Sequence, residues 1–410
     1  MSTNLDKTAL VIGASSESRY AIETAKKRGY KVVAFDGNPD APGLSWADKG
    51  IVTDIRDANN ILEHFNSWDM PAPSFVLPVP IGRYLTSTGS VNDALGLKGI
   101  SHKAANLCTD KYEFHCTLAD AGLRNGYCML IPAGDSADIL STDNIPLPFI
   151  LKPRFGSGSR GVYLVENVEQ REALKLELFP TDEDFIAETV FEGTEYGVDG
   201  CIFDGQLEIF LIRKKLITPP PYRQCVGYLS VDCRVYDTFY TKTTEYLSKV
   251  ANTLGMNHCL FHCDFMCDNT LNINLIEISA RPSGHNLHNM FTPMVTGFSM
   301  IDRYIDYMEG LVPATINSRL SGSSMLIGYF DMERVQVVSV PTRLELENSF
   351  ADDLLHYECN ISLGDILDTI ENGHQLMSRG FYILKGSDEA DLLRKKQELL
   401  SHFGVLWTRS

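Results

Sequence analysis

The sequence lacks the cysteine patterns that mark zinc sites and disulfide-stapled domains. Its ten cysteines include no C-x-x-C pair and follow no evident disulfide framework. Scattered cysteines of this kind are typical of reduced thiols, so we expect a protein of the cytoplasm.

Long hydrophobic runs are also missing. Residues 1–6 are polar and acidic, and the apolar run at residues 9–12 is far too short for a signal peptide. No run approaches the roughly 20 apolar residues that a membrane-spanning helix needs. We therefore expect no membrane partner.

Positive charge is scarce. The chain has 36 Lys and Arg against 53 Asp and Glu, which gives a formal net charge of -17. Such an acidic surface repels phosphate backbones, which argues against a nucleic-acid partner. A local basic pocket can still bind a small anion.

The remaining composition is that of an ordinary globular protein. The chain has 410 residues, 44% of them hydrophobic, and shows no internal repeat, so two to three domains are expected. Residues 8–13 and 31–36 are predicted strands on either side of a helix at residues 16–28. This βαβ order predicts an N-terminal parallel sheet covered by helices, with residues 75–80 as a later strand.

A glycine-rich stretch follows a predicted strand that carries Lys152. Glycine lets backbone amides approach a polyphosphate, and serine and arginine add donors. The residues of this loop are Gly156, Ser157, Gly158, Ser159, Arg160 and Gly161. It lacks the G-K-[S/T] ending of a Walker A loop. A plain hairpin loop with a solvated lysine is the alternative interpretation.

Two acids lie on consecutive predicted strands, at residues 259–266 and 271–280. Strand alternation places His262 and Asp264 on one face, and Glu277 on a face of the next strand. Two carboxylates together with substrate phosphates commonly hold magnesium. The apolar neighbours of Glu277 favour its burial, which calls for a cation. A pair of surface acids on a hairpin is the alternative.

Arg281 lies four residues beyond Glu277. Its guanidinium suits a substrate carboxylate or a transferring phosphoryl group, and an ion pair with Glu277 is the alternative. Upstream, Glu188 and Glu195 flank a glycine turn. Acids there can accept hydrogen bonds from adenine and ribose, although spacing alone indicates only a strand that ends in a turn.

The order of these stretches, from Thr8 to Gly310, resembles the ATP-grasp superfamily, and within it the carboxylate–amine ligases, including bacterial L-amino acid ligases. Biotin carboxylase and carbamoyl-phosphate synthetase are more distant likenesses. The resemblance implies a multidomain α/β and α+β fold. Its parts are an N-terminal α/β domain (1–110), an ATP-grasp region (111–310) and a C-terminal domain (311–410). The ATP-grasp region comprises a lid at about 145–190 and a central part at about 191–310.

The resemblance also implies residue roles. Nucleotide contacts fall on Lys111, Lys152, Gly156, Ser157, Gly158, Ser159, Gly161, Glu188, Thr189, Val190, Phe191 and Glu195. Metal ligands fall on Asp264, Glu277 and Ser279, and catalytic roles on Arg281 and Lys152. Substrate contacts are expected from Arg213, Lys214, Arg223, Ser283, Gly284, His285 and Asn286. Ser279 stands where these proteins usually have asparagine, and Asp264 where glutamate is commoner.

The implied activity uses ATP with one or two Mg²⁺ ions, for which Mn²⁺ can substitute. A small-molecule carboxylate becomes an acyl phosphate that an amine then attacks, and ADP and phosphate are released. Homodimers are common among similar ligases. Two alternatives share the fold, namely a biotin-dependent carboxylase with a separate carrier and a non-catalytic ATP-binding regulator.

Two further alternatives are weaker. A dinucleotide-binding oxidoreductase is disfavoured because the G-x-G-x-x-G glycines are absent after Gly13. A zinc site could draw on His258, Cys259, His262, Cys263 and Cys267. Alternation sends the cysteines to the face opposite the histidines, where small apolar side chains are the simpler interpretation.

Overall fold

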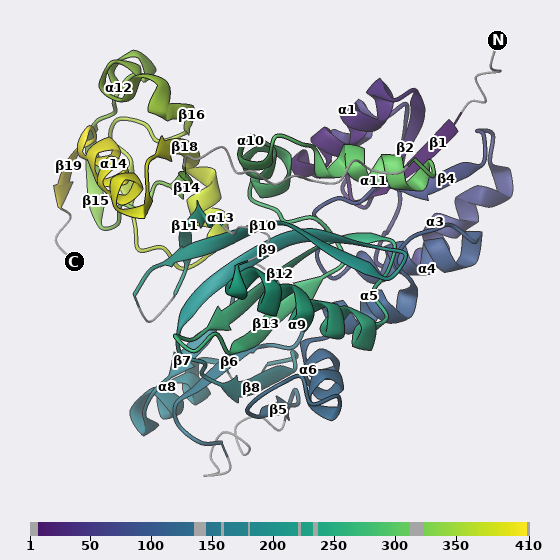
Figure 1. The fold of residues 1–410 in the computed structure, drawn as a ribbon, viewed down its shortest axis with the longest axis horizontal. Coiled ribbons are helices and arrows are strands. Elements are labelled where there is room, and N and C mark those ends of the chain that lie inside the picture. Colours follow the sequence, from purple (N-terminus) through teal and green to yellow (C-terminus); the bar gives the residue numbers. More distant parts are fainter. Residues whose placement is uncertain are drawn as a thin grey trace.

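The computed structural model describes residues 7–134, 145–156, 160–178, 181–219, 223–232, 237–311 and 324–407. Three residues of the predicted phosphate loop, Ser157, Gly158 and Ser159, lie outside this part of the chain. Figure 1 shows an N-terminal unit, a central sheet, a small sheet below it and a C-terminal unit.

The N-terminal unit contains a four-stranded parallel sheet in the order β3-β2-β1-β4. Its strands are β1 (Lys7–Ile12), β2 (Tyr30–Asp36), β3 (Lys49–Val52) and β4 (Pro73–Val76). The crossover is a 3₁₀ turn (Ser16–Ser18) followed by α1 (Arg19–Lys27). The predicted βαβ start and parallel sheet are confirmed. β4 stops before the predicted end at residue 80, because Pro78 and Pro80 cannot donate to a ladder.

Short helices surround this sheet and lead to the next unit. They are α2 (Pro42–Trp46), α3 (Ala58–Glu63), α4 (Leu85–Leu95), α5 (His102–Thr109) and α6 (Lys111–Asp120). The side chain of Asp110 caps α6 by accepting hydrogen bonds from the amides of Tyr112 and Glu113. The cap places Lys111 at the first position of α6.

The lid sheet is the small sheet below the central one, and it has four antiparallel strands in the order β5-β8-β6-β7. They are β5 (Cys128–Ile131), β6 (Phe149–Pro153), β7 (Tyr163–Val165) and β8 (Phe185–Thr189), with α8 (Val168–Leu178) packed on them. Its own core includes Phe149, Leu151 and Val165. Ile150 of β6 lies opposite Glu188 of β8. Lys152, two residues further, therefore shares a face with Glu188.

An eight-stranded sheet, in the order β13-β12-β9-β10-β11-β14-β18-β16, forms the centre of the molecule. Its first five strands are β9 (Thr194–Phe203), β10 (Gln206–Ile217), β11 (Cys225–Ser230), β12 (Cys259–Cys267) and β13 (Ile273–Ser279). Helix α9 (Thr238–Leu254) buries Leu247, Val250 and Leu254 at helical spacing. β8 and β9 are separated by only four residues, so this short segment joins the lid sheet to the central sheet.

The C-terminal unit completes the same sheet. β14 (Ser324–Tyr329), β18 (Gly380–Gly386) and β16 (Leu354–Cys359) extend it, and a second small sheet has the order β17-β15-β19. That sheet comprises β15 (Val335–Ser339), β17 (Ile366–Leu367) and β19 (Gly404–Trp407), beside α12 (Arg343–Phe350), α13 (Gly373–Ser378) and α14 (Glu389–Ser401). This unit has its own core, which includes Leu326, Tyr382 and Leu392.

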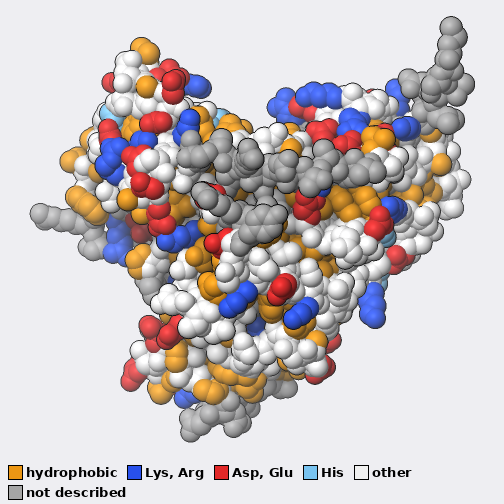
Figure 2. Space-filling model, in the orientation of Figure 1, with side chains coloured by type: hydrophobic (Ala, Val, Ile, Leu, Met, Phe, Trp, Pro, Cys, Tyr) orange, Lys and Arg blue, Asp and Glu red, His pale blue; other side chains and the backbone are white. Residues whose placement is uncertain are grey.

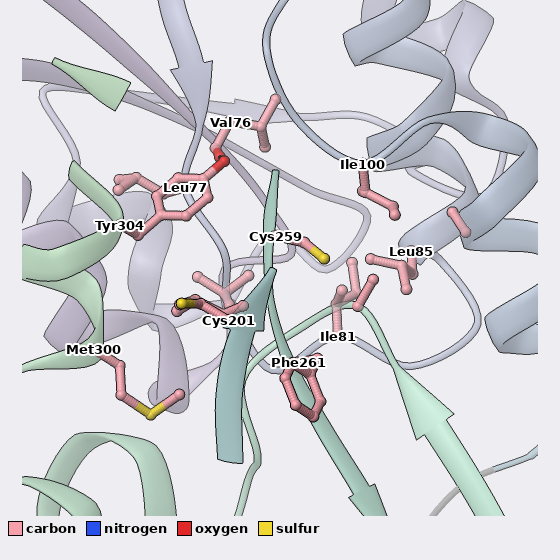
Figure 3. Close-up of a cluster of buried hydrophobic side chains, with 14 of the residues drawn as sticks. Val76, Leu77, Ile81, Leu85, Ile100, Cys201, Cys259, Phe261, Met300 and Tyr304 are labelled. Carbon is pink, nitrogen blue, oxygen red and sulfur yellow. The ribbon is translucent and has the colours of Figure 1, made fainter. Parts of the chain in front are cut away.

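The N-terminal unit and the central sheet share one hydrophobic core. Figure 3 shows Val76, the last residue of β4, and Leu77 in one cluster of buried side chains with Cys259 and Phe261 of β12. Tyr304 of α11 (Met300–Met308) donates a hydrogen bond to the carbonyl oxygen of Val76 at 3.2 Å. This shared core holds the ends of the parallel strands against the face of the central sheet.

Within the described residues, no helix is both long enough and apolar enough to span a membrane. On the described part of the face in Figure 2, basic side chains are scattered among acidic ones. Acids outnumber bases in the sequence as a whole, by 53 to 36.

Candidate active site

Four polar side chains form a buried cluster between the lid sheet, helix α6 and the connection from α6 to β5. Lys152 Nζ lies 2.5 Å from Glu188 Oε1, and Arg124 Nη2 donates to Glu188 Oε2 at 2.9 Å. His115 Nε2 lies 3.0 Å from the same Oε2. All four side chains are at most 7% exposed. We call this group the lid cluster.

Hydrogen bonding determines the state of His115. Arg124 Nη1 lies 2.8 Å from His115 Nδ1, and a guanidinium can only donate. Nδ1 therefore accepts, and the ring hydrogen sits on Nε2, towards Glu188. Burial lowers the pKa of His115 to about 4, so the ring is neutral at pH 7.

The charges of the lid cluster do not balance. Burial alone would raise the pKa of Glu188, but Lys152, His115 and Arg124 outweigh it and hold this pKa well below its usual range. One carboxylate thus faces two cations, and the cluster carries one excess positive charge. A buried excess charge is costly unless an anion compensates it.

Lys111 adds a third cation beside this cluster. Its Nζ donates to the carbonyl oxygen of Gly156, at the start of the predicted phosphate loop, at 2.8 Å. Burial lowers the pKa of Lys111, Glu277 raises it and Lys152 lowers it further, so both lysines and this acid lie within electrostatic reach. The two predicted nucleotide lysines are therefore brought together from separate elements.

Three charged side chains meet on the facing surface of the central sheet. Lys215 Nζ lies 2.5 Å from Glu195 Oε1 and 2.8 Å from Asp264 Oδ2. Burial would lower the pKa of Lys215, but Asp264 and Glu195 raise it well above its usual value. We call this group the sheet cluster. Two carboxylates here share one cation.

Asp264 and Glu277 lie directly opposite each other on β12 and β13, as the alternation predicted. Glu277 is half-buried, less than its apolar neighbours suggested, because it opens into a pocket. Gly197 of β9 is the register partner of Asp264. A Cβ there would stand 3.1 Å from Asp264 Oδ1 and 3.2 Å from Arg213 Nη2, so a larger residue would press on both side chains.

The pocket lies between the N-terminal unit, α6 and the central sheet. Its lining includes Gly82, Arg83, Lys111, Gly156, His262, Glu277, Ser279 and Arg281. Arg281 Nη1 donates to the carbonyl oxygen of Pro282 at 2.9 Å, and burial lowers the pKa of this guanidinium. One cavity therefore joins two of the three predicted metal ligands, Glu277 and Ser279, with one nucleotide lysine and the predicted catalytic arginine, while Asp264 does not line it.

The segment between β8 and β9 connects the lid sheet to the central sheet. Thr189 Oγ1 accepts a hydrogen bond from the amide of Tyr127 at 2.9 Å, and the guanidinium of Arg124 lies 5.4 Å from the ring centre of Phe191. Val190 is half-buried. Glu188 itself is occupied by three donors of the lid cluster, which leaves less capacity to accept from adenine than the resemblance implied.

The predicted substrate residues fall into two groups. Arg213 is 1% exposed and forms an ion pair with Asp199, which also accepts from Thr292 at 2.8 Å. Lys214 pairs with Glu389 of α14 at 2.6 Å. Neither lines the pocket, and Arg223 is half-buried outside it with a positive φ of 47°.

The other group is the loop that follows Arg281, with Ser283, Gly284, His285 and Asn286. His285 and Asn286 have φ values of 61° and 60°, a conformation that surrounding contacts must maintain. Tyr329 of β14 donates to the carbonyl oxygen of His285 at 2.8 Å. From the N-terminal unit, Glu17 Oε1 lies 3.5 Å from the amide of Asn286. The N-terminal and C-terminal units thus both hold this loop.

The zinc alternative has no support in the described part of the chain, which contains no group of three or more His, Cys, Asp or Glu placed to hold a metal. Cys259 and Cys263 pack in the core with Phe261.

Sequence reasoning missed several residues of this site. Lys215, His115 and Arg124 join the clusters from elements distant in the sequence. Lys215 alone left a local signal, since strand alternation puts it on the same face of β10 as Arg213.

Known proteins and one family model resemble this chain. Residues 145–289 match the ATP-grasp domain family model. The N5-carboxyaminoimidazole ribonucleotide synthase of Staphylococcus haemolyticus is 24% identical over 282 residues, which cover 67% of this chain and 71% of that protein.

Several solved structures resemble nearly the whole chain. The L-amino acid ligase from Bacillus licheniformis has a TM-score of 0.78 at 15% identity, covering 99% of this chain and 100% of that one. The ADP complex of N5-carboxyaminoimidazole synthetase from Staphylococcus aureus has a TM-score of 0.68 at 18% identity, covering 97% of each chain. The chain has an ATP-grasp fold, as its motifs predicted.

Proposed function

We propose that this ATP-grasp chain is a Mg-ATP-dependent ligase that activates a small-molecule carboxylate and joins it to an amine. One observation carries the proposal. Lys111, Glu277 and Arg281 line one pocket. Lys152 lies within electrostatic reach of Lys111, and Asp264 is the register partner of Glu277. Cations facing carboxylates suit a ligand that brings its own phosphates and a divalent cation.

The residues fit such a ligand by charge. The lid cluster has one positive charge too many, which a polyphosphate compensates. Asp264 and Glu277 supply oxygen ligands of the kind that Mg²⁺ prefers, and Ser279 beside them adds a hydroxyl. A bound Mg²⁺ neutralises charge on the phosphates and orients them.

The first proposed step is phosphoryl transfer. A carboxylate oxygen of the substrate forms a bond to the γ-phosphorus, the bond from that phosphorus to the bridging oxygen breaks, and ADP leaves. Lys111 and Lys152 hold phosphate oxygens in line for this displacement. The product is an acyl phosphate.

In the second step the nitrogen of a neutral amine attacks the acyl carbon. The C–O bond to phosphate breaks, phosphate leaves with the electron pair, and the proton of the amine passes to solvent or phosphate. Arg281 lines the pocket and is placed to stabilise the negative charge that develops on the acyl oxygen. The lid sheet must exclude water meanwhile, because hydrolysis would waste the acyl phosphate.

Substrate choice is assigned to the loop after Arg281 and to Arg83, which lines the pocket from the N-terminal unit. Arg83 and Arg281 offer positive charge to a substrate carboxylate, and Glu277 offers negative charge to a substrate amine. Small, polar substrates that carry these groups therefore fit the pocket. The amide product, ADP and phosphate are then released.

The test measures phosphate and ADP release with Mg-ATP across single and paired amino acids, followed by mass analysis. Release that needs two substrates, with the mass of their amide, supports the ligase. Release that needs bicarbonate would move the assignment to a carboxylase, and nucleotide binding without release for any pair would move it to a regulator. Lys152→Met serves as the inactive control.

A further inference from the structure

Arg154, two residues beyond Lys152, joins three segments of the chain. Its Nε and Nη2 bind Asp110 Oδ1 and Oδ2 at 2.9 and 2.6 Å, a bidentate ion pair. Its Nη1 donates to Asp184 Oδ2 at 3.2 Å. The guanidinium therefore ties the end of β6 to the cap of α6 and to the turn before β8.

Backbone hydrogen bonds and aromatic rings reinforce this joint. The amide of Lys111 donates to the carbonyl oxygen of Arg154 at 3.3 Å, and the amide of Arg154 donates to that of Asp184 at 2.8 Å. The guanidinium also lies 5.6 Å from the ring centre of Tyr112 and 5.2 Å from that of Phe155. One ring belongs to α6 and the other to the start of the predicted phosphate loop.

We propose that Arg154 is a positioning residue for the two phosphate-binding lysines. Asp110 caps α6, whose first residue is Lys111. Lys152 lies on β6, two residues before Arg154, which directly follows that strand. One ion pair therefore sets the distance between both ammonium groups and the base of the loop at Gly156, to which Lys111 is bonded. The inference rests on the proposed function, since it assigns a role in binding ATP.

The competing interpretation is a structural tie. The Arg154 side chain is 19% exposed and that of Asp110 is 6% exposed, so removing the guanidinium leaves a buried carboxylate without its bidentate partner. A structural role therefore predicts a loss of thermal stability and no change in the KM for ATP. A positioning role predicts a raised KM for ATP in addition, because misplacing a binding group by about 1 Å can cost on the order of a hundredfold in rate.

The experiment compares Arg154→Gln, Asp110→Asn and the double variant in the full chain. Asparagine remains a good helix cap, so Asp110→Asn removes the charge and keeps the start of α6. Arg343→Gln, which breaks an exposed ion pair with Glu347 in the C-terminal unit, is the matched control. The measurements are the unfolding temperature, the shift of that temperature with Mg-ATP, and KM and kcat for ATP.

We expect both single variants to raise the KM for ATP about tenfold with a smaller change in kcat, and the double variant to resemble either one, since both break the same pair. Arg154→Lys should recover part of the affinity by restoring one of the contacts. A KM for ATP in Arg154→Gln equal to that of the wild type would overturn the role of Arg154. Fully additive effects of the two substitutions in the double variant would do the same. Neither result would affect the proposed function. Absence of any Mg-ATP shift in the wild type would instead overturn the proposed function beneath it.

Discussion

The lid cluster and the sheet cluster are mirror images in composition. In the lid cluster one carboxylate, Glu188, faces two permanent cations, Lys152 and Arg124. In the sheet cluster one cation, Lys215, faces two carboxylates, Glu195 and Asp264. Each cluster is one charge from neutrality, in opposite directions. In the proposed complex, Mg-ATP compensates both, because it is anionic towards the lid and cationic towards the sheet.

Removing a cation from the lid cluster should have the largest effect. Lys152→Met leaves Glu188 compensated by Arg124, so we expect the protein to fold. The phosphates lose their deepest cation, and kcat/KM for ATP should fall at least about a hundredfold. The measurement is the rate of ADP release at a series of ATP concentrations, with the other substrates saturating.

Lys214→Met is the matched control for that variant, because Lys214 lies on β10 but pairs outward with Glu389. We expect near-normal activity from it. Equal losses in both variants would show that the lid cluster has no special relation to ATP.

Neutralising the sheet cluster should come next in size. Asp264→Asn keeps the shape of the side chain but removes one of the two charges facing Lys215. The Mg²⁺ concentration for half-maximal activity should rise about tenfold to a hundredfold. Magnesium titration of activity measures this, with Asp69→Asn, an exposed acid paired with Lys49, as control. An unchanged Mg²⁺ requirement would remove Asp264 from the metal site.

The lid cluster should also affect how the free energy of unfolding depends on pH. Glu188→Gln leaves two buried cations uncompensated and should lower the unfolding free energy at pH 7 by about 3 kcal/mol. Because the folded pKa of Glu188 is depressed, its contribution is complete above the unfolded pKa of about 4.3 and is lost as pH falls from there towards the folded pKa.

The difference between wild type and Glu188→Gln should therefore be largest at neutral pH and shrink below about pH 4. Denaturant unfolding at pH 7 and pH 3 measures both values. A difference that stays constant over this range would mean that the charge of Glu188 is not what stabilises the cluster.

The smallest effect should come from improving the sheet side of the pocket. Ser279 lines the pocket with Glu277, and its hydroxyl is a weaker magnesium ligand than an amide oxygen. Ser279→Asn should lower the half-saturating Mg²⁺ concentration a few-fold without changing the unfolding temperature by more than about 2 °C. A higher Mg²⁺ requirement would show that the asparagine does not reach the metal.

Local patterns accounted for much of what the sequence could predict. The βαβ start follows from periodicity within about thirty residues, and the pairing of Asp264 with Glu277 follows from two strands joined by a short turn. The first turn of the predicted helix at residues 16–28 is a 3₁₀ turn, a boundary detail that periodicity does not resolve.

From the sequence by itself, the order of the motifs predicted an ATP-grasp fold through its resemblance to that superfamily, and the motifs named residue types that line the pocket. Only the tertiary structure decided how these charges are shared. His115, Arg124 and Glu188 come from separate elements, as do Lys111 and Arg154, and Arg213 turned out to be buried against Asp199. Charge balance depends on distances across the fold, and a linear pattern records spacing along the chain but not which buried charge will find which partner.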